Sequence, residues 1–109
     1  MSEQIKWLPV GSVVRLHEGV KRVVIATRLP LFDNDGETVY YDYGAYLFPE
    51  GQISEHMFYF NHDDIEEVVY EGLHDEEEEK FCDVINENLS KIPYPKYEAP
   101  KEEGSEEEK

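Results

Sequence analysis

Apolar and polar residues alternate in two early segments of the chain, and each segment predicts a half-buried β-strand. The first is residues 12–17, SVVRLH, in which Val14 and Leu16 form one face. The second is residues 21–29, KRVVIATRL, whose more apolar face consists of Val23, Ile25, Thr27 and Leu29. A short link that contains Gly19 joins the two segments, so together they predict a β-hairpin.

Three later segments also predict strands, because they are rich in β-branched and aromatic residues. They are residues 37–48, ETVYYDYGAYLF, residues 53–60, ISEHMFYF, and residues 65–70, IEEVVY. Gly44 is a candidate position for a β-bulge in the first of these. Turn residues separate the strands, in residues 30–36, 49–51 and 61–64. The chain therefore contains about five predicted strands.

After residue 75 the apolar period changes from two to between three and four, which predicts a helix. One face of this helix carries Phe81, Val84, Ile85, Leu89 and Ile92. Asp75 is a suitable N-cap, and the glutamates that follow it complement the positive end of the helix dipole. We expect the helix to span about residues 75–90 and to end before Pro93. Its apolar face either docks on the sheet or receives a partner.

These elements predict an α+β fold, in which about five antiparallel strands are followed by one C-terminal helix. The sheet should be strongly bent or form an SH3-like, partly open barrel, because a flat five-stranded sheet would expose long edges. Residues 1–92 should form a single globular domain, with strands between about 12 and 70. Residues 93–109 are acidic and rich in proline, without an apolar period, and predict a disordered tail.

The charge of the chain limits its partners. The formal net charge is −16, and residues 62–80 contain ten acidic residues and one lysine. Such a surface repels nucleic acid and anionic membranes, and it leaves a basic protein partner, metal ions or plain solubility as explanations of the charge. No apolar run is long enough for a membrane helix, and the N-terminus has no apolar leader segment. With Cys82 as its single cysteine, the chain is expected to be cytoplasmic and not inserted into a membrane.

The best candidate metal site surrounds the turn after the fourth predicted strand. It consists of His56, Asn61, His62, Asp63 and Asp64. Imidazole and carboxylate groups suit zinc or a non-haem metal, but this spacing matches no established site. Asn61 or Asp63 as the cap of a turn explains the same residue types. We therefore favour the cap, and we expect no cofactor.

Other candidate chemistry is weaker. Residues 33–37, DNDGE, are similar to part of a calcium loop, but the glycine is fourth instead of sixth, which indicates a hairpin loop. The consecutive glutamates at 66–67 and 76–79 point in different directions and are typical of a solvated surface. Cys82 lies in the helical run, where a lone cysteine is typical of a small buried residue.

Aromatic residues crowd the two adjacent strands at 37–48 and 53–60, and they outnumber what one inner face can hold. Most of them are expected to form the core and its rim. Tyrosines that point outward would form a protein-binding patch. The candidate partner-binding residues are Tyr40, Tyr41, Tyr43, Tyr46, Phe58 and Tyr59.

Several segments together resemble a small family of uncharacterised proteins of Gram-positive bacteria. The segments are LPVGSVVRL, KRVVIATR, YDYGAYLFPEG, FYFNHDDIEEVVYEG and DEEEEKF, which cover about residues 7–81. Genes of this family tend to lie beside those of WXG-type proteins and LXG toxins, the substrates of type VII secretion. The resemblance implies a cytoplasmic accessory, such as a chaperone or targeting factor for a secreted toxin. It carries no catalytic residue to this chain.

The leading functional hypothesis is a non-enzymatic protein-binding module for a type VII secretion substrate, with a secreted toxin or a WXG-type protein as its partner. The first alternative is an acidic, immunity-type inhibitor that covers the basic active site of a toxin. The second alternative is a metal-dependent enzyme that uses His56, His62 and either Asp63 or Asp64.

Overall fold

The structure is a computed structural model that describes residues 6–17, 19 and 21–98. It contains seven strands, one α-helix and two short 3₁₀ helices among these residues. In chain order these elements are β1 (Val13–Leu16), β2 (Arg22–Arg28), β3 (Leu31–Asn34), β4 (Glu37–Tyr40), β5 (Tyr43–Phe48), β6 (Phe58–Phe60), η1 (His62–Asp64), β7 (Ile65–Tyr70), α1 (Glu76–Asn88) and η2 (Leu89–Lys91).

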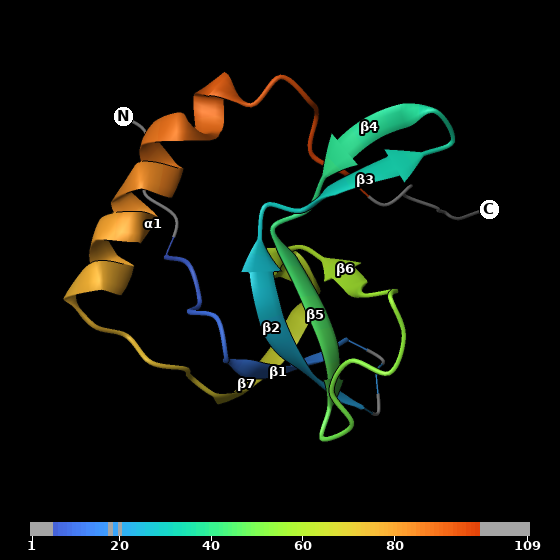
Figure 1. Cartoon of the computed structure of the whole chain (residues 1–109), viewed down its shortest axis with the longest axis vertical. Coiled ribbons are helices and arrows are strands. Elements are labelled where there is room, and N and C mark those ends of the chain that lie inside the picture. The colour runs from blue at the N-terminus through green and yellow to red at the C-terminus, as the bar shows by residue number, and fades with distance from the viewer. Residues whose placement is uncertain (1–5, 18, 20, 99–109) are drawn as a thin grey trace.

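Five of the strands form one antiparallel sheet in the order β6-β5-β2-β1-β7 (Figure 1). Strands β6 and β7 are its two edges, although only Asn61 and the short η1 separate them along the chain. That short connection brings the two edges together at one corner, so the sheet must bend strongly. The sheet nevertheless stays open, and the predicted α+β class with a strongly bent sheet and a C-terminal helix is confirmed.

Alternation along the strands explains which side chains form the core. Val14, Val23 and Ile25 point to the inner face of the sheet and are buried, as the predicted period requires. The remaining members of the core cluster come from the N-terminal segment, β5, β6 and α1: Trp7, Tyr43, Ala45, Phe60 and Ile85. The opposite face of β1 and β2 carries Val13 and Val24, which point away from this cluster.

The predicted strand at 37–48 is divided into β4 and β5, and the loop predicted at 30–36 contains β3. β3 and β4 form a separate two-stranded hairpin that projects from the sheet (Figure 1). Its turn is Asp35-Gly36, with φ angles of 54° and 89°, the left-handed pair that a type I′ turn requires. Asp33 accepts a hydrogen bond from the Gly36 N–H at 2.8 Å, so the calcium-like sequence is a hairpin turn, as expected.

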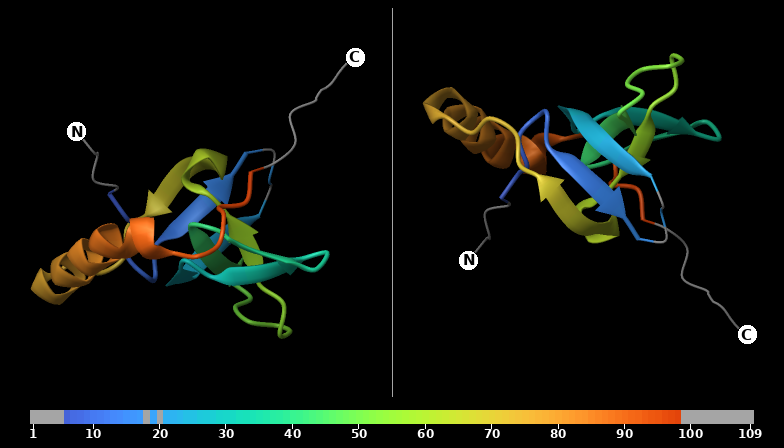
Figure 2. Two further views of the ribbon diagram at one scale, coloured as in Figure 1. Left: turned by 90° about the horizontal axis from the view of Figure 1, so that it is seen from above. Right: turned by 90° about the horizontal axis from the view of Figure 1, so that it is seen from below.

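Helix α1 lies beside the sheet, and the N-terminal segment passes between them (Figures 1 and 2). Asp75 is its N-cap and accepts a hydrogen bond from the Glu78 N–H at 3.0 Å, which confirms the predicted start. Only part of the predicted apolar face is covered: Ile85 is buried, whereas Phe81 and Val84 are about half exposed. The helix therefore keeps apolar surface facing solvent.

The first residues of the predicted tail are docked on the molecule. Tyr40 N–H donates to Pro95 O at 3.0 Å, and Tyr97 N–H donates to Tyr40 O at 2.8 Å, so residues 95–97 run parallel to β4. Asn61 Nδ2 also donates to Tyr97 O at 2.8 Å. The prediction of a disordered tail from residue 93 is therefore wrong for residues 93–98. Residues 99–109 lie outside the described part of the chain.

Candidate partner-binding surfaces

The six predicted partner-binding aromatics lie in four different surroundings. Tyr43 is fully buried, its hydroxyl oxygen accepts a hydrogen bond from the Leu8 N–H at 2.9 Å, and burial raises the pKa of that hydroxyl. The prediction is thus wrong for Tyr43, because the side chain cannot reach a partner. Tyr40 is half-buried on β4, where the backbone of the docked tail pairs with it. The other four belong to two separate groups.

Tyr41 and Tyr59 belong to a tyrosine stack that also contains Phe32 and Tyr97. The ring centroids of Tyr41 lie 5.4 Å from those of Tyr59 and 5.0 Å from those of Tyr97, in nearly parallel pairs. Phe32 closes the group at 5.3 Å from Tyr59. The stack joins the hairpin, β6 and the tail, so its rings are largely used in holding these segments together.

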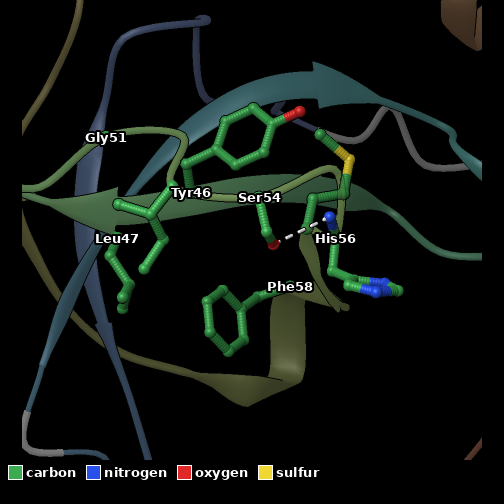
Figure 3. Close-up of a pocket in the computed structure, with 8 residues that line it drawn as sticks. Tyr46, Leu47, Gly51, Ser54, His56 and Phe58 are labelled. Carbon is green, nitrogen blue, oxygen red and sulfur yellow. Dashed lines mark hydrogen bonds between the residues drawn. The ribbon is translucent and has the colours of Figure 1, made fainter.

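Tyr46 and Phe58 line a small loop pocket, which the segment after β5 folds over (Figure 3). The cavity has a volume of about 120 Å³, and its walls also include Leu47, Gly51 and Met57. The His56 N–H donates to Ser54 Oγ at 3.1 Å and fixes the loop beside the pocket. A cavity of this size accepts no more than one or two side chains of a partner.

A larger apolar surface, the sheet groove, lies across the outer face of the sheet. It is lined by Gly11, Val13, Arg22, Val24, Phe48, Val69 and Tyr70 and has a volume of about 370 Å³. The strand register places these residues together, since Val13 is opposite Val24 on one side and Tyr70 on the other. The Arg22 guanidinium lies over the Phe48 ring, 5.0 Å from its centroid. The surface that lines the groove is almost wholly apolar.

Acidic residues on and directly after β7 form an acidic border next to one wall of the sheet groove, whereas the charged residue in its lining is Arg22. Glu66 and Glu67 are exposed on β7 itself, and Glu71 follows it directly. Arg15 pairs with Glu67, so the excess of negative charge there rests on the other two. An apolar floor beside an acidic border is typical of a surface that binds apolar and basic side chains together. Sequence reasoning missed this groove, because its residues come from four strands.

The five candidate metal ligands do not form one cluster. His56 lies at the loop pocket, whereas His62 packs against Tyr43 at a ring distance of 4.9 Å. Asn61 is the N-cap of η1, one of the two predicted alternatives, and its N–H donates to Asp64 Oδ2 at 2.9 Å, so Asp64 rather than Asp63 completes the cap. In the described part of the chain, no group of three or more His, Cys, Asp and Glu side chains is arranged to hold a metal ion.

His62 instead belongs to a buried polar cluster centred on Asp42, which is 1% exposed. The carboxylate of Asp42 accepts a hydrogen bond from the backbone N–H of His62 at 2.8 Å, and it pairs with Lys96 Nζ at 3.0 Å. Tyr43 Oη lies 3.3 Å from His62 Nδ1, and the neutral imidazole accepts a hydrogen bond from the hydroxyl there. Burial lowers the pKa of His62, and Lys96 adds to this effect, while Asp42 opposes it.

The lowered pKa of His62 predicts a loss of stability in mild acid. Below the ordinary histidine pKa of 6.5, the unfolded chain binds a proton that the folded chain resists, so the free energy of unfolding falls as the pH decreases. We expect the urea midpoint to fall between pH 7 and pH 5, and to fall less in His62→Gln. His56→Gln, at one of the exposed histidines, is the control for the substitution itself. Equal slopes in all three proteins would contradict the assignment.

A second polar group joins β2 to α1. Arg28 donates two hydrogen bonds to the Glu78 carboxylate, at 2.6 and 3.1 Å, and one to Leu8 O at 3.1 Å. The Arg28 guanidinium lowers the pKa of Glu78. Burial beside this carboxylate raises the pKa of Cys82 to about 11, so its thiol stays protonated, as a structural cysteine does.

Together, these features define a small acidic α+β domain with a bent, open sheet and an apolar groove on its outer face. The chain belongs to the DUF4176 family, a domain of unknown function, whose family model matches residues 7–81. The match includes all residues of the sheet groove and ends within α1. No significant match was found among curated proteins or among solved structures. None of the described helices has the length and apolar character needed to cross a membrane.

Proposed function

We propose that this protein is a non-enzymatic protein-binding module that holds an apolar segment of a partner in the sheet groove. The observation that carries the proposal is the groove itself. It has a volume of about 370 Å³ and almost wholly apolar walls, and it opens to solvent on the outer face of the sheet. Binding sites are typically hollows lined mainly by apolar side chains. The tyrosine stack and the loop pocket offer less, since one is used internally and the other is small.

We further propose that the partner is a type VII secretion substrate and that this chain acts in the cytoplasm as its chaperone or targeting factor. Membership of the family supports this role, because the resemblance places such genes beside those of LXG toxins and WXG-type proteins in Gram-positive bacteria. The acidic border of the groove supports it too, since it favours a partner segment with basic residues next to apolar ones.

Co-expression with the LXG- or WXG-type protein encoded next to this chain tests the proposal. The two proteins should co-purify, and Val69→Ser, in the groove, should weaken binding several-fold, because the partner buries the 40% of Val69 that is exposed and full burial of a valine side chain contributes roughly 1.5–3 kcal/mol. Val84→Ser on α1 is the matched control, since Val84 is 50% exposed and lies outside the groove. Failure to co-purify, together with unchanged export after deletion, would refute the role.

The acidic surface supports one other function, an immunity-type inhibitor that covers the basic active site of a toxin. Ten acidic residues lie between positions 62 and 80 with a single lysine. The two functions differ in the part of the toxin that is bound. An inhibitor binds the isolated toxin domain and rescues cells from it, whereas a targeting factor binds the export region of the substrate.

A further inference from the structure

Strand β7 is an unpaired edge of the sheet. Within residues 6–17, 19 and 21–98, it pairs with β1 only, so its other side presents backbone N–H and C=O groups to solvent. It is six residues long, whereas the opposite edge, β6, has three. Of the two edges, β7 therefore offers the longer row of free hydrogen-bonding groups.

The second half of β7 is apolar as well as exposed. Val68, Val69 and Tyr70 are 45%, 40% and 64% exposed, and they are consecutive, so both faces of the strand present apolar side chains. Two of the three, Val69 and Tyr70, form one wall of the sheet groove. A strand that paired with β7 would lie directly beside this wall. Natural proteins cover or charge such an edge unless it serves in binding.

We infer that an extended segment of the partner adds to the sheet as a sixth strand along β7, with its apolar side chains in the sheet groove. This inference rests on the proposed function and specifies how the partner is bound. The main-chain hydrogen bonds of β7 supply pairing that does not depend on sequence, and the groove selects the side chains of one face. The bound segment therefore has alternating residues, apolar on the face toward the groove.

Charge identifies the remaining residues of that segment as lysine or arginine. Glu66 and Glu71 lie at the two ends of β7, and Glu67 between them is paired with Arg15. A second copy of this chain carries the same net charge of −16, and this like charge opposes the pairing of two acidic edges. Residues 99–109 of this chain hold five acidic residues and two lysines, so the same repulsion opposes them. The occupant is thus a basic segment of a different protein.

Two peptides of eight residues test the inference on the full chain. One alternates lysine and valine, and the other has the same composition with valines spaced three and four apart, as on a helix. The alternating peptide should bind at least tenfold more tightly, and it should slow amide hydrogen exchange in residues 65–70 at least tenfold. Residues 58–60 of β6 should be unaffected. An alternating peptide of glutamate and valine should not bind.

Several outcomes would overturn the inference: no binding of the alternating peptide at millimolar concentration, equal binding of both peptides, binding without protection of β7, or protection of β6 or α1 instead. Dimerisation of the chain through β7 in sedimentation experiments would also overturn it.

These outcomes are distinct from failure of the proposed function. If the neighbouring protein binds and Val69→Ser weakens it, but β7 stays unprotected, then only the strand addition is refuted. If the peptide protects β7 while the neighbouring protein does not bind, only the secretion role is refuted.

Discussion

A chain that ends at Ile92 is expected to unfold at a lower temperature than a chain that ends at Glu98. The longer chain retains every described contact of the tail, whereas the shorter one loses the Lys96–Asp42 ion pair, the Tyr97–Tyr41 stack and the backbone pairing with Tyr40. The comparison therefore isolates residues 93–98.

The size of this effect follows from opposing contributions. Loss of Lys96 leaves the buried Asp42 carboxylate without its cation, and a buried charge stripped of its partner costs about 3–5 kcal/mol. Each lost backbone hydrogen bond adds about 1 kcal/mol, and the aromatic pair about the same. Lys96 is partly exposed, and release of six residues regains about 1–2 kcal/mol of backbone entropy each. This entropy offsets most of the lost contacts, so the unneutralised Asp42 carboxylate is what makes the shorter chain the less stable of the two.

Thermal unfolding of the two chains, followed by circular dichroism, measures the difference. Asp42→Asn in the chain that ends at Ile92 provides the internal check. If the unneutralised carboxylate causes the loss, this substitution should cost less in the short chain than in the chain that ends at Glu98. Equal melting temperatures for the two chain lengths would mean that the tail contributes nothing to the fold.

Glu78→Leu should lower the free energy of unfolding by about 2–3 kcal/mol, because it leaves the buried Arg28 guanidinium with Leu8 O as its remaining acceptor. The side chains of Arg28 and Glu78 are 5% and 12% exposed, so water replaces the lost carboxylate poorly. The double variant Arg28→Met/Glu78→Leu should recover part of the loss, since it removes the stranded charge. Urea unfolding of the three proteins gives these values.

Glu79→Leu is the matched control, because Glu79 is the next residue of α1 but its side chain is 67% exposed. It should change stability by less than about 0.5 kcal/mol. The lowered pKa of Glu78 also means that the ion pair weakens only as the pH falls below the ordinary glutamate value of 4.5. A loss in Glu78→Leu no larger than that in Glu79→Leu would show that the pair does not hold α1 in place.

Local patterns were sufficient to predict most of the fold. The period of two placed β1 and β2 and their inner residues Val14, Val23 and Ile25 correctly. Asp75 marked the start of α1 because N-caps depend on residues only three positions away. Each of these features depends on neighbours in the chain, which is why one sequence was enough.

The features that were missed depend on contacts between distant residues. The division of residues 37–48 is set at Asp42, whose N–H bonds Asn61 and whose C=O bonds the Leu29 N–H, and no local pattern shows this. The hairpin loop at Asp35-Gly36 was predicted, but the strand before it, β3, was not, because residues 30–36 are dominated by turn-forming residues. The docked tail has a disorder-prone composition, and its order comes from Asp42 and Tyr41, which lie more than fifty residues away.

The candidate site was predicted only in kind. An excess of aromatics indicated a binding surface, but the sequence could not show that Tyr43 is buried or that Tyr41 stacks on the tail. The sheet groove consists of residues with no unusual spacing, since Val13, Val24 and Val69 meet through strand pairing. The acidic run near β7 was visible in the sequence, whereas its place beside the groove required the fold.

The most direct test of the central claim is an amide-exchange map of this chain in complex with its proposed partner, an LXG- or WXG-type protein. Binding at the sheet groove predicts protection concentrated in residues 65–70, with smaller changes in the neighbouring β1. Protection confined to the loop pocket or to α1, with β1, β2 and β7 all unchanged, would contradict the claim.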